Sequence, residues 1–327
     1  MMLPALLIIL VVAVIPSELR GQERYSVSYG GFAGYHAPLW AAKDLGLFAK
    51  HGLNADPVMI AGSARGMQAL LSGSTHFALA DATGPVSALY QGADVVLVAS
   101  AMNKFPFSMY AQKEITRHAD LKGKRIGIAS FGGATEWGLN LGLREWNVPR
   151  DSVTVTAHGP GANRLLALST KGVDAALLAP PESAQAEREG MRFLGHLSEL
   201  KANFPMAVVV VRRAFLEKNR DPVKRFIQAY SEAIHEFKTD KDKMIAVYNQ
   251  RLKQRNPQVI EQTYSYFAPI FFLPPRVPLD GARYTVELIA QRSPPDKLPP
   301  VVEQFVDNSI VDELEREGFF KKLGARR

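Results

Sequence analysis

Residues 25–53 read YSVSYGGFAGYHAPLWAAKDLGLFAKHGL. The first residues alternate as those of a β-strand do, and the apolar residues after the turn have the spacing of an amphipathic helix that ends at Gly52. Between the two lies a glycine-rich turn that carries Phe32, Tyr35 and His36. The turn has two interpretations. It shapes a ligand site with its aromatic rings, or it is a tight corner whose rings belong to the core.

The segments that follow continue the alternation of strand and helix. Ser63 stands where a helix N-cap is expected, and glycines and small residues separate the elements. Short connections of this kind predict an α/β fold with a largely parallel sheet. In such sheets ligands bind beyond the carboxyl ends of the strands. We predict strands at residues 24–30, 53–61, 75–82 and 94–103, and helices at 37–52, 63–73 and 84–92.

The pattern restarts near residue 120 and repeats the same plan of strand, glycine-bearing turn and helix. A chain of 327 residues is long enough for two lobes, each with its own core. Two lobes of similar plan are therefore the simplest interpretation. In the second lobe we predict strands at residues 120–130, 151–159, 173–180 and 191–197, and helices at 131–146, 162–172 and 181–190.

The connections between the halves both contain Phe-Pro followed by an extended apolar run: KFPFSMYAQKEI and NFPMAVVVVRRAFLEKN. We predict that residues 104–110 and 204–211 form two crossing strands that hinge the lobes. The sequence after Val211 is largely helical, and we expect it to pack back on the first lobe. The predicted domains are a signal peptide at residues 1–21, a discontinuous first lobe at 22–104 and 207–327, and a second lobe at 105–206.

The apolar run from Leu3 to Ile15 is too short for a membrane-spanning helix and is typical of a secretory signal peptide. An uncleaved N-terminal anchor is the alternative, and it leaves the same domain outside the membrane. The chain has no cysteine, which excludes disulfides, thiolate metal sites and a lipid-modified cysteine. We therefore expect a free periplasmic protein. Its net charge of +7 comes from scattered residues, without the aromatic-interleaved basic stripe of a nucleic-acid-binding protein.

Several segments, taken in order, resemble a known family. They are LGLFAKHGL, GSARGMQALLSGSTHFALADATG, ALYQGADVVLVAS, DLKGKRIGIASFGG and APPESAQAEREG. This set resembles the periplasmic substrate-binding proteins of nitrate/sulfonate/taurine-type ABC importers, which are related to the thiamin-pyrimidine-precursor-binding proteins. The resemblance implies the α/β, two-lobed type II periplasmic binding protein fold, with two crossover strands and a helical C-terminal segment. It also implies a monomer without cofactor, whose partners are a small-molecule ligand, an ABC permease and the permease's ATPase.

We expect the ligand site where the loops after the strands of both lobes meet. Each candidate residue has a structural alternative: the small residues cap helices, the aromatic residues fill the core, and the acids pair with arginines such as Arg164. Two acids at the site would also repel a purely anionic ligand. The candidates are Phe32, Tyr35, His36, Ser63, Asp81 and Thr83 in the first lobe, Gly133, Ala134, Thr135 and Glu182 in the second, and Phe105 at the hinge.

We interpret the chain as a solute-binding protein without catalytic activity, because it shows no G-x-S-x-G and no H-E-x-x-H motif. Small organic acids and sulfonates are the first class of solute we expect, nitrogen heterocycles the second and inorganic anions the last. An enzyme of the same fold that acts on a pyrimidine or menaquinone-type precursor is the alternative. A sensor that presents its closed form to a membrane kinase is a third possibility.

Overall fold

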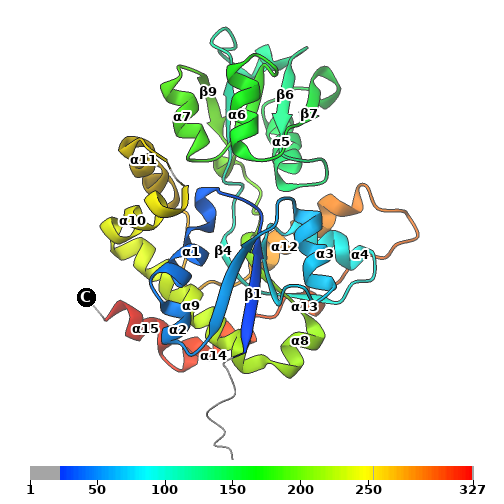
Figure 1. The fold of residues 1–327 in the computed structure, drawn as a ribbon. Helices are drawn as coiled ribbons and strands as arrows, with labels where there is room; N and C mark the ends of the chain where they lie inside the picture. Colours follow the sequence, from blue (N-terminus) through cyan, green and yellow to red (C-terminus); the bar gives the residue numbers. More distant parts are fainter. Residues whose placement is uncertain (1–22, 253, 326–327) are drawn as a thin grey trace, which may run out of the picture.

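The structure, a computed structural model, describes residues 23–252 and 254–325. Figure 1 shows two lobes, one above the other, connected by extended segments of chain. The signal peptide predicted at residues 1–21 lies outside the described residues. Within the described ranges, no helix has both the length and the apolar character needed to cross a membrane.

The first lobe is built on a five-stranded sheet with the order β2-β1-β3-β10-β4. Strand β1 pairs in parallel with β2 and β3, and β10 runs antiparallel between β3 and β4. The central strands are rich in β-branched and apolar residues, which suits strands that are covered on both faces. The strands are β1 (Arg24–Tyr29), β2 (Asn54–Met59), β3 (Phe77–Ala80), β4 (Val95–Met102) and β10 (Met206–Arg212).

The second lobe repeats this plan in the order β7-β6-β8-β5-β9. Strand β6 pairs in parallel with β7 and β8, and β5 runs antiparallel between β8 and β9. The two sheets therefore have equivalent strand orders, and the predicted two-lobed α/β fold is confirmed. The strands are β5 (Ser108–Ala111), β6 (Arg125–Ile128), β7 (Thr154–Ala157), β8 (Ala175–Leu178) and β9 (Arg192–His196).

The chain crosses between the lobes twice, and the two crossings lie side by side. The Phe204 amide donates to the Asn103 carbonyl at 3.1 Å, and the rings of Phe105 and Phe204 stack at 4.1 Å. Residues 103–107 and 201–205 are irregular, so the segments predicted as strands are strands only from Ser108 and from Met206 onward. Their prolines lack an amide donor, which explains why the crossings contain no continuous ladder. The first-lobe strand β10 begins at Met206, one residue before the predicted lobe boundary.

The helix predicted at residues 37–52 is two helices, because Gly46 adopts a left-handed conformation with φ 69°. Ser63 is not an N-cap: the N-cap of its helix is Gly62, and Ser63 is the first helical residue. The other predicted helices of both lobes are present. Their bounds are α1 (Ala37–Asp44), α2 (Leu47–Lys50), α3 (Ser63–Leu71), α4 (Thr83–Tyr90), α5 (Ala134–Glu145), α6 (Gly161–Ser169) and α7 (Glu182–Arg188).

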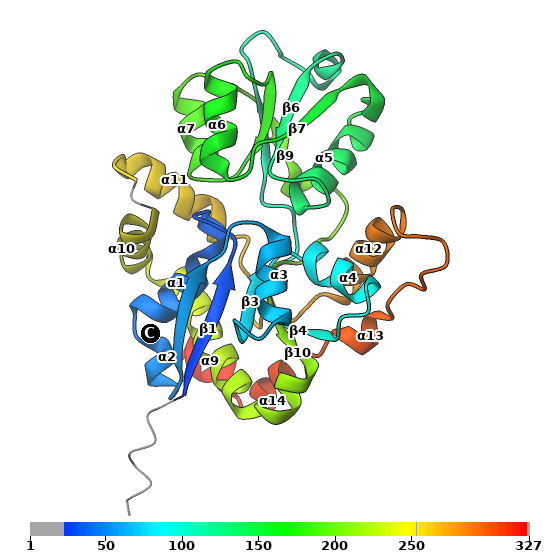
Figure 2. The same ribbon diagram turned by 45° about the vertical axis from the view of Figure 1, so that its right-hand side comes forward.

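The C-terminal third is helical and surrounds the first lobe, as predicted (Figure 2). Phe226 of α9 stacks on Phe77 of β3 at 4.4 Å, which joins the long helix to the sheet. Helix α11 also packs against α7 of the second lobe, so the segment contacts both lobes. The helices are α8 (Arg213–Lys218), α9 (Arg220–Thr239), α10 (Lys241–Leu252), α11 (Pro257–Phe267), α12 (Leu279–Ala290), α13 (Val302–Phe305), α14 (Ser309–Arg316) and α15 (Phe319–Gly324).

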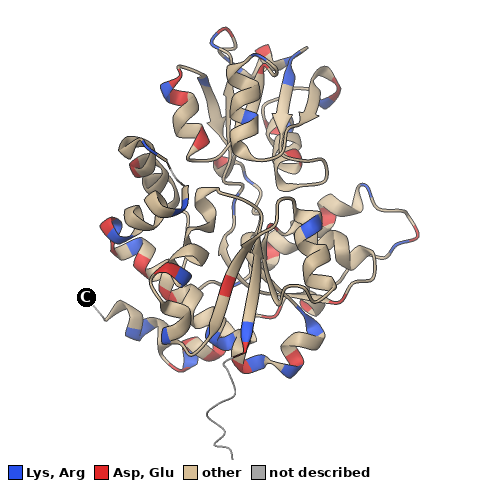
Figure 3. Ribbon diagram, in the orientation of Figure 1, with Lys and Arg blue, Asp and Glu red and all other residues tan. Residues whose placement is uncertain are grey.

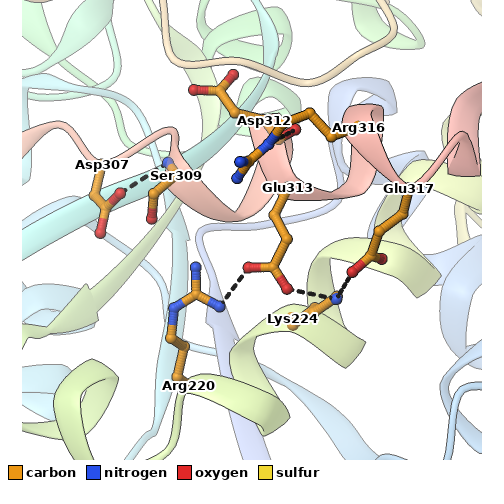
Figure 4. A network of polar contacts seen from close by, with 8 residues as sticks. All are labelled: Arg220, Lys224, Asp307, Ser309, Asp312, Glu313, Arg316 and Glu317. Carbon is orange, nitrogen blue, oxygen red and sulfur yellow. Dashed lines mark hydrogen bonds and ion pairs between the residues drawn. The ribbon is translucent and has the colours of Figure 1, made fainter.

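Ion pairs join α14 to α9 at the end of the molecule away from the second lobe (Figure 4). Glu313 accepts hydrogen bonds from Arg220 and Lys224, and Lys224 also donates to Glu317, all at 2.6 Å. These hydrogen bonds lower the pKa of Glu313 to about 2. Elsewhere on the described part of the chain, basic and acidic residues are interspersed over both lobes (Figure 3).

Candidate functional site

The candidate site lies where the carboxyl ends of the parallel strands of both lobes meet. The loop after β1 approaches the loop after β8, and the Gly34 amide donates to the Pro180 carbonyl at 3.1 Å across the junction. The Gly34 carbonyl accepts from the Tyr248 hydroxyl at 2.9 Å. A Cβ on Gly34 would lie 2.5 Å from the Phe267 ring and 2.8 Å from Thr263. Only glycine therefore fits this position between α11 and the second lobe.

Tyr35 and His36 follow Gly34 in a short 3-10 turn, Gly34–His36, that leads into α1. Their rings lie 4.5 Å apart, and the Tyr35 ring also meets Phe107 and Phe267 edge-on. Burial raises the pKa of Tyr35 to about 12, so its hydroxyl stays protonated. Phe32, earlier in the same turn, is 49% exposed. The turn thus combines one exposed ring with two rings directed inward.

His36 is 4% exposed, and neither ring nitrogen has a hydrogen-bond partner among the described residues. Its ring lies edge-on to Tyr29 at 5.4 Å and 6.0 Å from Trp40. This apolar burial lowers the pKa of His36 to about 3, so the ring is neutral near pH 7. Buried polar atoms in folded proteins nearly always have a partner, which makes His36 an unusual group.

Asp81 organises the other predicted residues of the first lobe. Its carboxylate accepts from the Ser63 hydroxyl at 3.1 Å, from the Thr83 amide at 2.9 Å and from the Thr83 hydroxyl. The structure therefore brings Ser63, Asp81 and Thr83 together, as members of one hydrogen-bonded group at the starts of α3 and α4. These contacts favour the structural alternative for Asp81, since both of its oxygens already have donors.

The candidates Gly133, Ala134 and Thr135 lie at the start of α5. Gly133 is the N-cap of the helix, and the side chain of Thr135 accepts from the Ala129 amide at 3.0 Å. The Glu136 carboxylate accepts from the Gly132 amide at 2.6 Å. A carboxylate of the chain itself thus occupies part of this helix start, which favours the capping interpretation of the turn.

Glu136 also forms an ion pair across the junction. The two terminal nitrogens of Arg292, from the segment after α12, donate to its two oxygens at 2.7 and 2.8 Å. The Arg292 guanidinium also lies 4.4 Å from the centre of the Trp137 ring. Burial acts to raise the pKa of Glu136, but the bonds from Arg292 and Gly132 outweigh it and hold that pKa below its usual range. The pair joins the C-terminal segment of the first lobe to the second lobe.

Glu182, the first residue of α7, lies beside the start of α6. A Cβ on Gly161 would lie 2.7 Å from its carboxyl carbon. Burial raises the pKa of Glu182 to about 7, although Arg164 acts in the opposite direction. The carboxyl group is therefore partly protonated at neutral pH. Tyr35 interacts electrostatically with Arg164, Asp81 and Glu182, so these groups from both lobes share one neighbourhood.

Arg164 lies close to Tyr35 and Glu182. The sequence analysis predicted it only as a partner for the acids and not as a candidate for the ligand site. It is 5% exposed, and its guanidinium donates to the carbonyls of Leu177, at 2.7 Å, and Gly159. Its position in the first turn of a helix that follows the GPG of residues 159–161 was the available signal.

Phe105 lies at the hinge, as predicted, but it is fully buried and stacks on Phe204. This packing assigns it to the hinge core in the present conformation. Across the described residues, no three His, Asp or Glu side chains gather in a way that could hold a metal ion.

Comparison with known proteins identifies the family. The pattern of the NMT1/THI5-like family matches residues 33–243, and the chain belongs to this family. A provisionally named binding protein from Brucella abortus (strain 2308) is 32% identical over 218 residues, which are 63% of this chain. The chain spans 66% of the length of that relative.

Solved structures show the same fold. The periplasmic sulfonate-binding protein SsuA, from a provisionally assigned sulfonate ABC transporter of Methylobacillus flagellatus KT, superposes with a TM-score of 0.69. It is 18% identical, and the match covers 91% of this chain and 95% of SsuA. The desulfurization enzyme DszB superposes with a TM-score of 0.65 at 16% identity, covering 90% of this chain and all of DszB. The fold is thus shared by a binding protein and an enzyme.

Proposed function

We propose that this protein is a periplasmic solute-binding protein that captures a small organic solute between its lobes and delivers it to an ABC import permease, which an ATPase drives. The observation that carries the proposal is the meeting of equivalent strand ends from two lobes that are joined by two crossings. Membership of the NMT1/THI5-like family supports it. The protein acts as a monomer and returns the solute unchanged.

The mechanism is an equilibrium between open and closed forms about the two crossings. A solute that contacts both lobes favours the closed form by its extra contacts there. In the present structure the lobes already touch, through Gly34 with Pro180, Arg292 with Glu136, and Arg188 with Gln258. Closure therefore has specific contacts that do not depend on a solute.

The class of solute that we propose is a small organic acid or sulfonate. The sulfonate-binding protein SsuA has the same fold, and the charges at the junction are compatible with an anion. Asp81 is satisfied by its own hydroxyl and amide donors, and burial keeps Glu182 partly neutral. The neutral fraction of Glu182 therefore makes the predicted repulsion between the acids and an anionic solute smaller than the residue types alone indicate.

An enzyme on the same fold is the competing function, because DszB shares this architecture. At the junction, the Ser63 hydroxyl donates to a carboxylate that also binds a helix start, which is an arrangement for capping rather than for activating a nucleophile. We therefore favour binding.

The test is a screen of the purified protein by thermal shift against organic acids, sulfonates and nitrogen heterocycles, followed by mass spectrometry of the bound solute. We expect at least one solute to raise the Tm and to be recovered unchanged. Uptake of that solute into vesicles that contain the cognate permease and ATPase completes the test. Recovery of a chemically altered solute, or stabilisation without uptake, contradicts the transport function.

A further inference from the structure

Two buried side chains with unused hydrogen-bonding atoms come from opposite lobes at the junction. His36, from the first lobe, is 4% exposed with both ring nitrogens unpaired among the described residues. Arg164, from the second lobe, is 5% exposed. Tyr35 connects them, because its ring lies 4.5 Å from His36 and its hydroxyl interacts electrostatically with Arg164.

The guanidinium of Arg164 is held in place by neutral groups. Its Nε donates to the Leu177 carbonyl at 2.7 Å and its Nη1 to the Gly159 carbonyl. Nη2 makes no hydrogen bond to any residue that the structure describes, and no carboxylate of the described ranges forms an ion pair with the group. A buried cation without a counterion is costly, which makes this guanidinium a ready partner for an oxyanion. Its planar fork suits a carboxylate or a sulfonate.

The acids near Tyr35 do not supply that counterion. Asp81 accepts three hydrogen bonds from Ser63 and Thr83. Glu182 interacts with Arg164 at longer range than an ion pair, and its burial favours the protonated form. One additional negative charge therefore suits the site, whereas a dianion would be opposed by both acids.

The rest of the solute meets aromatic surface. The rings of Tyr35 and His36 adjoin, and the neutral imidazole of His36 has one nitrogen that can donate and one that can accept a hydrogen bond. Phe32 exposes about half of its surface in the same turn. An unsaturated, flat body fits such rings better than a flexible chain, because offset stacking adds to burial.

We propose that the solute is a monoanionic aromatic carboxylate or sulfonate, whose oxyanion binds the guanidinium of Arg164 and whose ring lies against Tyr35 and His36. This inference rests on the proposed function and narrows its solute class. Arg164 is then the residue that selects for negative charge, and the turn that carries Tyr35 and His36 selects for the ring.

The test uses calorimetric titration of the full-length protein with four probes: benzoate, benzenesulfonate, the neutral analogue benzenesulfonamide and the aliphatic butanesulfonate. We expect at least one aromatic anion to bind about 10- to 100-fold more tightly than benzenesulfonamide, as a charged hydrogen bond predicts. The same anion should bind more tightly than butanesulfonate. This comparison needs no variant and does not depend on how a substitution folds.

The variant Arg164→Lys keeps the positive charge but loses the planar guanidinium, and Arg164→Met loses both. We expect Arg164→Met to lose the preference for the anion and Arg164→Lys to keep only part of it, while affinity for benzenesulfonamide stays within about twofold of wild type in both. Arg283→Met, which removes an exposed arginine paired with Glu303 in the first lobe, is the matched control and should bind as wild type does.

Equal binding of the neutral analogue and the anions overturns the inference, as does an unchanged anion preference in Arg164→Met. Failure of both aromatic anions to bind at millimolar concentration overturns it as well. In each of these cases the proposed function stands if another solute of the screen binds and is transported unchanged. If no solute of any class is bound or transported, the proposed function itself fails.

Discussion

The carboxylate of Glu136 in the second lobe accepts two parallel hydrogen bonds, of 2.7 and 2.8 Å, from the guanidinium of Arg292 in the first. The carboxylate side chain is 3% exposed and the arginine side chain is 47% exposed. Bidentate pairs of this kind fix geometry as well as adding energy. Because the two residues belong to different lobes, their bond exists only when the lobes are close together.

The first prediction concerns this bond. Replacing Arg292 with methionine leaves Glu136 buried with only the Gly132 amide as donor, so we expect the closed form to lose about 1–2 kcal/mol. The fraction of open molecules should rise, and solute affinity should fall by about tenfold. Small-angle scattering measures the first effect and titration with a solute from the screen measures the second.

Arg283→Met is the control for this variant as well, because it removes an arginine–glutamate pair that lies within one lobe. It should leave both the scattering profile and the affinity unchanged. A variant of Arg292 with wild-type scattering and affinity would show that the ion pair has no part in closure.

The second prediction follows from the raised pKa of Glu182, about 7. A carboxyl whose folded pKa exceeds its unfolded value, about 4.3, stabilises the fold less as pH rises. Between pH 4.5 and 7 its contribution to the free energy of unfolding should fall by roughly 2–3 kcal/mol. Urea titrations across this range should show that loss in the wild type, and Glu182→Gln should remove it. Identical pH profiles for the two proteins would refute the assignment.

The same group predicts a pH dependence of binding. Benzenesulfonate is ionised throughout this range, so only the protein titrates. The affinity of the wild-type protein for benzenesulfonate should fall as Glu182 ionises near pH 7, because the carboxylate then repels the anion. In Glu182→Gln the affinity should be constant. A fall in affinity of the same size in both proteins would assign the effect to another group.

The third prediction concerns His36, whose pKa burial lowers to about 3. A histidine with a depressed pKa stabilises the fold when neutral, and this contribution is lost as pH falls from about 6.5 towards the folded value. His36→Phe should therefore make the protein less sensitive to acid between pH 6.5 and 4. Because neither ring nitrogen has a partner among the described residues, its stability at pH 7 should stay within about 1 kcal/mol of wild type.

Thermal unfolding at several pH values checks this, and His36→Phe also reports on the solute. If the neutral imidazole contacts the solute, affinity should fall even though the folded protein is as stable as before. If His36→Phe keeps the acid sensitivity and the solute affinity of the wild type, His36 is not part of the solute site.

The sequence predicted the fold well because the relevant signals are local. The alternation of strand and helix patterns and the glycines between them follow from nearest neighbours in the chain. The break between α1 and α2 was missed because Leu45, Gly46 and Leu47 preserve the amphipathic spacing, and only the left-handed φ of Gly46 interrupts the helix. The two crossings were predicted, but their irregular first residues were not, because an apolar run does not show which of its amides will be paired.

The meeting of the loops that carry the candidate residues was predictable, and their individual contacts were less so. Loops at the carboxyl ends of parallel strands must meet, which is why Gly34 and Pro180 could be brought together by topology alone. The burial of Arg164 depends on the Leu177 carbonyl of a neighbouring strand. Glu136 and Arg292 are 156 residues apart in the chain. Contacts between residues so far apart in the sequence leave no periodic pattern, so local sequence cannot predict them.

The fourth prediction uses the ion pairs between α9 and α14. Lys224 donates to Glu313 and Glu317, and its side chain is 20% exposed. Lys224→Met should reduce the free energy of unfolding by about 1 kcal/mol, the usual range for a partly exposed pair in a network. Amide exchange in α14 should accelerate. Lys321→Met, at an exposed position of α15, is the control. Unchanged exchange in α14 would show that apolar packing alone holds the helix.

The fifth prediction concerns Gly34, whose amide donates to the Pro180 carbonyl of the other lobe. An added Cβ would lie 2.5 Å from the Phe267 ring, so Gly34→Ala must displace either α11 or the turn that carries Tyr35. Either movement disturbs the hydrogen bond from the Gly34 amide to Pro180 and the one from Tyr248 to the Gly34 carbonyl. We expect a loss of about 2–3 kcal/mol in the free energy of unfolding, as for overpacking of a core position, and at least a tenfold loss of solute affinity.

Gly30→Ala is the matched control for this variant. Gly30 belongs to the same turn, and a Cβ there has open space around it. Its φ also lies outside the range that side chains avoid, so the substitution should leave stability and affinity at wild-type values. If both alanine variants lose affinity equally, the whole turn needs glycine for its flexibility. If only Gly34→Ala does, the close approach of the first lobe to α11 and Pro180 is what the solute site requires.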